Sequence, residues 1–119
     1  MITGIGIDII ELKRMDKSVQ RQQRFPKRVL TESELDDYHR LTSARRQIEF
    51  IAGRFAAKEA FAKATGQGIG ELSFQHIEVI RLDTGAPIMK VTGYEDYHIH
   101  LSISHSQEYV VAQVVLEQR

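Results

Sequence analysis

The chain of 119 residues contains no cysteine, which excludes disulfide bonds, a thiolate nucleophile and a zinc site built on cysteine. It has no apolar run of about 20 residues, the length that a membrane-spanning helix needs. The N-terminus also lacks the basic start and the apolar core of a signal peptide. These absences predict a soluble, cytoplasmic protein with no membrane partner.

Neither sign of charge is in excess, because 16 lysines and arginines balance 16 aspartates and glutamates. We therefore expect no general attraction to nucleic acid or to a membrane surface, and any electrostatic partner must be recognised by a local patch. A hydrophobic content of 42% suits one compact domain, residues 1–119, with a core of its own.

The order of the expected elements predicts an α+β fold: an N-terminal strand, three helical segments including one long central helix, and then a mainly antiparallel sheet. Apolar periodicity and capping residues place the helical segments at residues 12–23, 30–41 and about 43–65. Thr31 and Ser33 are the cap candidates of the second segment, where Glu34, three residues after Thr31, indicates a capping box, and Gly66 ends the third segment. The expected strands cover residues 2–11, 74–82, 88–91, 98–104 and 109–116.

The first strand alternates large and small side chains, with Ile5, Ile7 and Ile9 on one side and Gly4, Gly6 and Asp8 on the other. The two glycines would let a helix or another backbone approach closely on the side that carries Asp8. Asp8 itself either caps the helix that follows or is a functional carboxylate.

The long helix carries an acidic residue, Glu59, near the middle of an apolar stripe formed by Ile48, Ala52, Phe55, Ala56 and Ala62. A carboxylate held away from water needs a cation, a metal or several hydrogen-bond donors. One interpretation is a simple ion pair with Lys63 one turn later, worth a few tenths of a kcal/mol. The alternative is that Glu59 faces a cleft, where it binds a metal or accepts a proton.

Positive charge is concentrated between Arg14 and Arg28, where Arg14, Lys17, Arg21 and Arg24 recur every three or four residues. Pro26 starts a new turn that carries Lys27 and Arg28. In a neutral chain, this concentration predicts a docking surface for an acidic partner. Phe25 and Met15 are candidates for its apolar anchors.

Three histidines near the C-terminus, His98, His100 and His105, do not indicate zinc, because they share one hairpin and no cysteine accompanies them. His105, in a serine-rich turn, is better suited to holding a phosphate. Asp8 and Glu59 are oxygen ligands of the kind that Mg²⁺ prefers.

Three motifs, GIGIDIIE, GRFAAKEAFAKA and LSISHS, together and in this order resemble the holo-acyl-carrier-protein synthase family of phosphopantetheinyl transferases. The similarity runs from Ile2 to about Leu116. It implies transfer of 4'-phosphopantetheine from coenzyme A to a serine of apo acyl carrier protein, with release of adenosine 3',5'-bisphosphate.

The resemblance also implies roles for individual residues. Asp8 and Glu59 fall on the Mg²⁺ ligands, and the acceptor of the serine proton is either Glu59 or a metal-bound water. The remaining matches concern coenzyme A: Lys63, Arg54 and His105 for its phosphates, Arg45 and Arg46 for the 3'-phosphate, and the segments Gly66–Gly70 and Gly85–Pro87 beside the nucleotide.

The resemblance implies that the acidic partner of the basic segment is acyl carrier protein, because acyl carrier proteins are acidic. The residues that would contact the carrier are Arg14, Arg21, Arg24, Phe25 and Arg28. Short members of the family resemble homotrimers with active sites between subunits. Two other interpretations stay open: a coenzyme A or nucleotide-binding module without catalysis, and a Mg²⁺-dependent phosphohydrolase.

Overall fold

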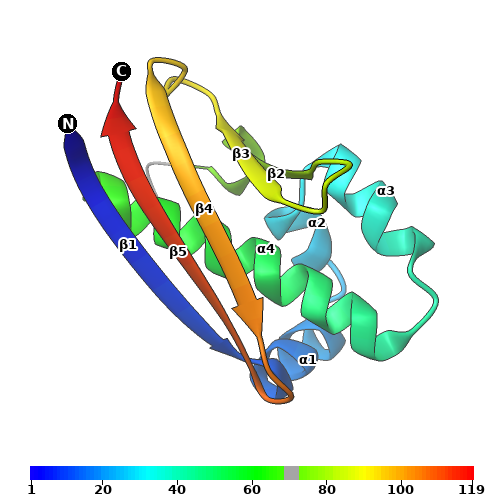
Figure 1. Cartoon of the computed structure of the whole chain (residues 1–119). Helices are drawn as coiled ribbons and strands as arrows, with labels where there is room; N and C mark the ends of the chain where they lie inside the picture. The colour runs from blue at the N-terminus through cyan, green and yellow to red at the C-terminus, as the bar shows by residue number, and fades with distance from the viewer. Residues whose placement is uncertain (69–72) are drawn as a thin grey trace.

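The computed structural model describes residues 1–68 and 73–119, and it confirms the expected α+β class. Three antiparallel strands form the main sheet in the order β1 (Ile2–Glu11), β5 (Tyr109–Gln118) and β4 (Tyr97–His105). A separate hairpin consists of β2 (Ile77–Arg81) and β3 (Pro87–Val91). The helices are α1 (Leu12–Arg21), α2 (Phe25–Val29), α3 (Glu32–Arg40), α4 (Ala44–Thr65) and the short 3₁₀ helix η1 (Phe74–His76) (Figure 1).

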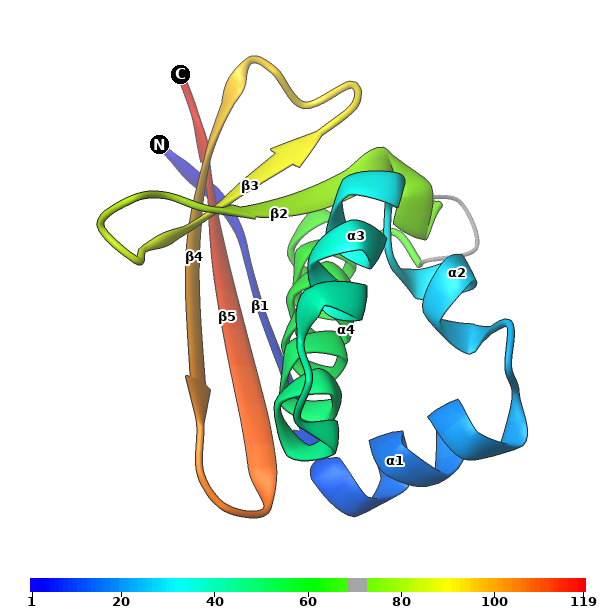
Figure 2. The ribbon, with the colours of Figure 1, turned by 90° about the vertical axis from the view of Figure 1, so that its right-hand side faces the viewer.

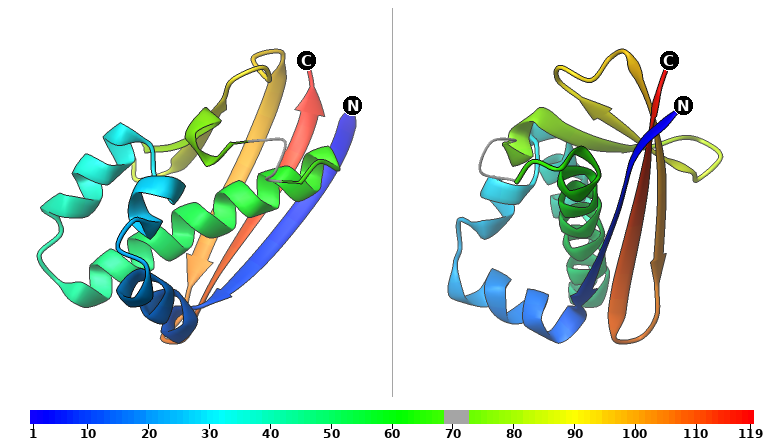
Figure 3. Two further views of the ribbon diagram at one scale, coloured as in Figure 1. Left: turned by 180° about the vertical axis from the view of Figure 1, so that it is seen from behind. Right: turned by 90° about the vertical axis from the view of Figure 1, so that its left-hand side faces the viewer.

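Helix α4 is the centre of the packing. It crosses one face of the main sheet obliquely, and α1, α2 and α3 lie beyond it on the same side of the sheet (Figures 2 and 3). The helix begins after Ser43, whose hydroxyl accepts a hydrogen bond from Arg46 N, and it ends at Gly66, which adopts a left-handed φ of 78°. Ala52, Ala57 and Phe61 are fully buried, so the helix is covered on two faces.

The two glycines of β1 allow the contact between this strand and α4. An added Cβ at Gly6 would lie 1.9 Å from the carbonyl oxygen of Ala60, and one at Gly4 would lie 1.9 Å from that of Ala64. The backbone of the strand therefore touches the backbone of the helix, as the sequence predicted. Asp8 lies on this same side of β1.

The opposite side of the main sheet is uncovered by the helices, and its β1 edge is apolar. Ile5, Ile7 and Ile9 of β1 are 62%, 56% and 60% exposed, and they lie beside Val111 and Val115 of β5. In the described part of the chain, no helix is both long enough and apolar enough to span a membrane.

Several boundaries differ from the sequence prediction, and α2 is a helix beyond the three expected segments; two of the differences change which residues lie together. Residues 74–76 form η1 and not the start of a strand, because Ser73 caps this turn and the Gln75 side chain turns back to donate to Leu30 O at 2.9 Å. Helix α1 ends at Arg21, so Arg24 lies outside the helix and does not share the face of Arg14 and Lys17.

Candidate functional site

Asp8 and Lys63 are joined at the contact between β1 and α4. The Lys63 ammonium donates to Asp8 Oδ1 at 2.9 Å and to Ile7 O at 3.0 Å. The second carboxylate oxygen of Asp8, Oδ2, is buried and receives no hydrogen bond from the residues that the structure describes. The alternative role of Asp8 as a helix cap is wrong: α1 follows Glu11, three residues later, because β1 continues past Asp8.

Glu59 lies one turn before Lys63 and is half-buried. Burial, and then the negative charge of Asp8, raise the pKa of Glu59, while Lys63 partly offsets this rise. The simple i,i+4 ion pair does not describe this group, because the Lys63 ammonium is hydrogen-bonded to β1. Asp8, Glu59 and Lys63 are called the carboxylate cluster below.

The carboxylate cluster suits a cation. It offers a buried carboxylate oxygen without a donor and a second carboxylate whose charge is disfavoured by the first. No group of three or more histidines, aspartates or glutamates that could hold a metal lies within residues 1–68 and 73–119. Two carboxylates without further protein ligands match Mg²⁺, which completes its coordination with water and substrate phosphates. They do not match a structural zinc site.

A second group of predicted residues lines a cavity of about 540 Å³ between the start of α4, the β2–β3 hairpin and the end of β4. We call it the basic pocket, and its predicted members are Arg46, Arg54, Gly85, Pro87 and His105. Sequence reasoning missed Arg40 and Arg81, which also line it. The position of Arg81 at the end of a strand, just before the glycine turn, is a signal that could have identified it.

Arg54 is the most buried cation of the basic pocket. Its guanidinium lies 4.0 Å from the ring centroid of Phe50, and its Nε is buried without an acceptor in the described part of the chain. Burial lowers the pKa of Arg54, and the charge of Glu34 partly opposes this. His105 adds a ring nitrogen that lies 3.9 Å from Glu49 Oε2. The pocket therefore has unused donor capacity for an anionic ligand.

Arg45 does not join Arg46 in the basic pocket. It donates to Glu49 Oε2 at 3.0 Å and to Gln107 O at 2.6 Å, so it holds the β4–β5 turn. Consecutive helical residues differ by about 100° in direction, which explains why the two arginines separate. Gly66 follows Lys63 at the other end of α4, and residues 69 and 70 of the expected glycine loop lie outside the described residues.

The carboxylate cluster and the basic pocket are separate within one chain. Asp8 belongs to β1 and His105 to β4, the two edges of a sheet in which β5 lies between them. Adjacent strands are about 4.8 Å apart, so the edges are about 10 Å apart. Along α4, Arg46 of the basic pocket lies in the first turn, whereas Glu59 lies toward the other end of the helix. One copy therefore does not bring all the predicted residues together.

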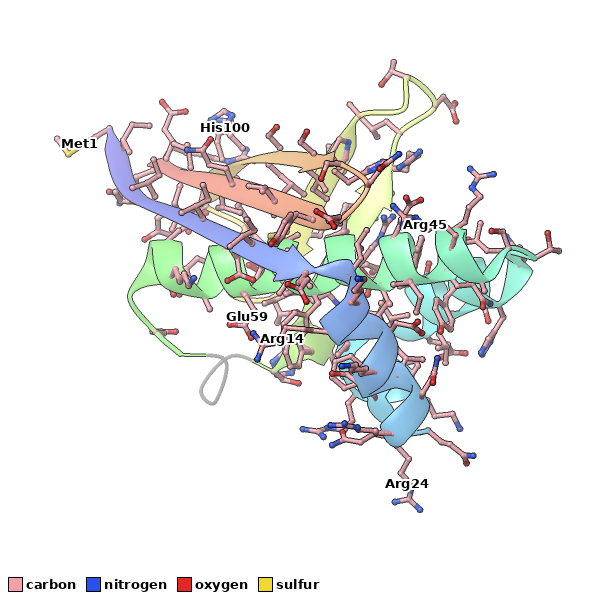
Figure 4. The ribbon with its side chains drawn as sticks, turned by 90° about the horizontal axis from the view of Figure 1, so that it is seen from below. Met1, Arg14, Arg24, Arg45, Glu59 and His100 are labelled. Carbon is pink, nitrogen blue, oxygen red and sulfur yellow. The ribbon has the colours of Figure 1, made fainter. Side chains whose placement is uncertain are left out.

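The predicted docking segment lies next to Glu59. Arg14 projects on the same side of α4 as Glu59 (Figure 4). The ring of Phe25 is 5.9 Å from that of Phe55, and Phe55 is 5.6 Å from Phe74. Sequence reasoning did not identify Phe55 as the residue that Phe25 contacts. Phe55 precedes Glu59 by four residues, so the two lie one turn apart on the same face of α4.

The arginines at positions 14, 21, 24 and 28 are exposed, whereas Met15 is buried in the core. Met15 is thus not available as an apolar anchor, and that expectation was wrong.

Comparisons with known proteins show what this chain is similar to. Residues 4–114 match the model of the 4'-phosphopantetheinyl transferase superfamily. The chain is 63% identical to a holo-[acyl-carrier-protein] synthase of Oceanobacillus iheyensis, over 100% of this chain and 99% of the relative, and 54% identical to that of Bacillus subtilis, over 98% and 97%. A crystal structure of a holo-(acyl-carrier-protein) synthase from Bacillus anthracis in complex with CoA (3',5'-ADP) superposes with a TM-score of 0.91 at 52% identity, covering 100% of this chain and 99% of that chain.

Proposed function

The chain belongs to the 4'-phosphopantetheinyl transferase superfamily, and we propose that it performs the reaction for which its relatives are named. It transfers 4'-phosphopantetheine from coenzyme A to a serine hydroxyl of apo acyl carrier protein and releases adenosine 3',5'-bisphosphate. The observation that carries this proposal is the carboxylate cluster beside the exposed basic segment. A cytoplasmic location is compatible with the cysteine-free sequence.

The carboxylate cluster supplies the charge control that phosphoryl transfer needs. Asp8 and Glu59 would hold Mg²⁺, which when bound neutralises charge on the pyrophosphate. Lys63 already holds Asp8, and its side chain is 55% exposed, so it can also contact a phosphate. The serine oxygen forms a bond to the phosphorus of the phosphopantetheine, and the bond from that phosphorus to the adenosine bisphosphate oxygen breaks.

Glu59 is a suitable acceptor for the serine proton. In the metal-free chain, burial and then Asp8 raise the pKa of Glu59, whereas a bound Mg²⁺ would lower it, so a metal-bound water is the alternative acceptor. The contact between Phe25 and Phe55 holds α2 against α4 one turn before Glu59. A carrier docked on the basic segment would therefore reach the Glu59 carboxylate. Arg14, Arg21, Arg24 and Arg28 attract the acidic carrier, and Phe25 provides the apolar contact.

The basic pocket would bind the nucleotide end of coenzyme A, with Arg46, Arg54 and His105 on its phosphates and the Gly85–Pro87 turn beside the base. Because this pocket and the carboxylate cluster lie at opposite edges of the sheet, we propose that they meet only between copies. The exposed face of Ile5, Ile7 and Ile9 supports a cyclic assembly in which the β1 edge of one copy lies beside the β4 edge of the next. The family resemblance implies three copies.

Transfer is tested by the intact mass of apo acyl carrier protein after incubation with the chain, coenzyme A and Mg²⁺. We expect a gain of one phosphopantetheine group, which a chelator or Glu59→Gln abolishes. An unmodified carrier would favour the binding module. Adenosine bisphosphate released without a modified carrier would favour the hydrolase.

Sharing of the site between copies is tested by mixing two inactive variants, Glu59→Gln and Arg46→Ala/His105→Ala. Random mixing in a shared-site assembly restores about a quarter of the sites, because an intact carboxylate cluster then meets an intact basic pocket. If both halves came from the same copy, the mixture would be no more active than the sum of its parts.

A further inference from the structure

A buried lysine, Lys58, lies immediately before Glu59 on α4 and has no part in the reaction described above. Its side chain is 0% exposed and that of its partner Glu34 is 2% exposed. The Lys58 ammonium donates to Glu34 Oε1 at 2.6 Å, to Val29 O at 2.7 Å and to Phe74 O at 3.2 Å. A lysine ammonium has three donors, and all three are used.

Glu34 is equally well satisfied. Its Oε1 accepts from Thr31 N at 2.8 Å, which completes the capping box of α3, and its Oε2 accepts from Val79 N at 2.8 Å. Lys58 and Glu34 therefore connect α4 with the end of α2, the start of α3, η1 and β2. Stability alone does not account for this arrangement, because well-packed apolar residues often replace a buried ion pair without loss of stability.

The contact with Val29 is the functionally informative one. Val29 is the last residue of α2, the helix that presents Phe25 and Arg28. A second side chain holds the same helix end: Gln75 Nε2 donates to Lys27 O and to Leu30 O, both at 2.9 Å. The C-terminal carbonyls of α2 are thus fixed from α4 and from η1.

At the opposite end of α2, the ring of Phe25 packs against Phe55 on α4, and the Phe25 N–H donates locally to Gln22 O at 3.0 Å. A helix of five residues is too short to keep its place by its own hydrogen bonds. The position of α2 relative to Glu59 therefore depends on these side-chain contacts. The one made by a charged donor is the hydrogen bond from Lys58, the residue next to Glu59, to Val29 O.

We propose that Lys58 is a positioning residue that fixes the carrier-docking helix α2 at a set distance from the Glu59 carboxylate. This inference rests on the proposed function. Without the Lys58 ammonium, α2 would move relative to α4, so that a docked carrier presents its serine away from Glu59. Arg54 of the basic pocket lies one turn before Lys58 and interacts with the charge of Glu34, so coenzyme A binding is compared in Lys58→Met, the variant that keeps Glu34.

The test uses Lys58→Met, with Glu34→Gln/Lys58→Met as a second variant that leaves no unpaired buried charge. Both are assayed at a temperature at which circular dichroism shows them folded. We expect kcat/KM for the carrier to fall on the order of 10- to 100-fold, since displacement by about 1 Å has effects of this size. In Lys58→Met, the dissociation constant of adenosine 3',5'-bisphosphate should stay within about twofold of the wild-type value.

Leu116→Ala, a core substitution on β5 remote from α2, is the matched control for lost stability. It should lower the melting temperature without changing KM for the carrier. If both Lys58 variants behave like this control, the role of Lys58 is only structural and the inference is overturned.

Amide hydrogen exchange of residues 25–31 provides a readout that needs no transfer assay. Exchange there should accelerate at least about tenfold in Lys58→Met and not in Leu116→Ala, because local opening reflects the contacts that hold a segment. Unchanged exchange overturns the inference. Failure of the wild-type chain to modify a carrier would instead overturn the proposed function, and exchange alone would then decide whether Lys58 holds α2.

Discussion

Replacing Gly6 by alanine should damage both the fold and the reaction, because it acts where β1 touches α4. The new Cβ would lie 1.9 Å from Ala60 O, whereas Cβ contacts below 3.0 Å are essentially never found. The strand and the helix must then separate by about 1.1 Å. Overpacking of this kind costs about 1–3 kcal/mol, which corresponds to a fall in melting temperature of about 5–15 °C. Asp8 follows two residues later on the same side of β1, so the rate of transfer should fall on the order of 100-fold.

Thermal melting and carrier modification measure the two effects of Gly6→Ala separately. The matched control for stability is Gly53→Ala, at a buried glycine inside α4, where the nearest atom to an added Cβ is Ile103 Cγ2 at 3.7 Å. This control should melt higher, since alanine is favoured over glycine inside a helix by about 1 kcal/mol. A Gly6→Ala protein that melts like the wild type and transfers within about twofold of its rate would refute the packing argument.

Three further predictions follow from the site and the helix ends. Because the pKa of Glu59 is raised in the folded state, its protonated form stabilises the fold at and below about pH 4.5, and this contribution is lost as pH rises through the folded pKa. Glu59→Gln should therefore raise the melting temperature of the metal-free protein at pH 8 but not at pH 4, and an equal gain at both would contradict this. Gly66→Ala, at a φ of 78°, should lower the stability to urea by about 1 kcal/mol, and no change would show that the helix end relaxes. Arg14→Glu/Arg21→Glu should raise KM for the carrier and spare coenzyme A binding, and equal loss of both would argue against separate surfaces.

Features that depend on residues close together in the sequence could be predicted. The capping box of Thr31 and Glu34, the stop at Gly66 and the close approach at Gly4 and Gly6 each follow from what a side chain does to its own backbone or to the next layer. Asp8 and Glu59 could be selected because a carboxylate on an apolar stripe or beside glycines needs a partner.

Features that depend on contacts between distant segments could not be predicted from the residues alone. The partner of Lys63 is Asp8, 55 residues earlier, and not the nearby Glu59. The sequence does not distinguish Lys58 from an exposed lysine. Only the fold brings Val29, Glu34 and Phe74 around its ammonium. The separation of the carboxylate cluster from the basic pocket likewise depends on strand order.

Helix α4 links these contacts between distant segments, because it carries residues of each of them. Its 22 residues, about 33 Å long, direct Glu59 and Lys63 toward β1, Lys58 toward α2 and α3, and Arg46 and Arg54 toward the basic pocket. A rotation of the helix that improved one of these contacts would weaken the others. The glycines of β1 restrict such a rotation, because the strand backbone rests directly on that of the helix. We therefore infer that close packing at Gly4 and Gly6 serves the site as much as the core, since it fixes the orientation from which all three sets of side chains project.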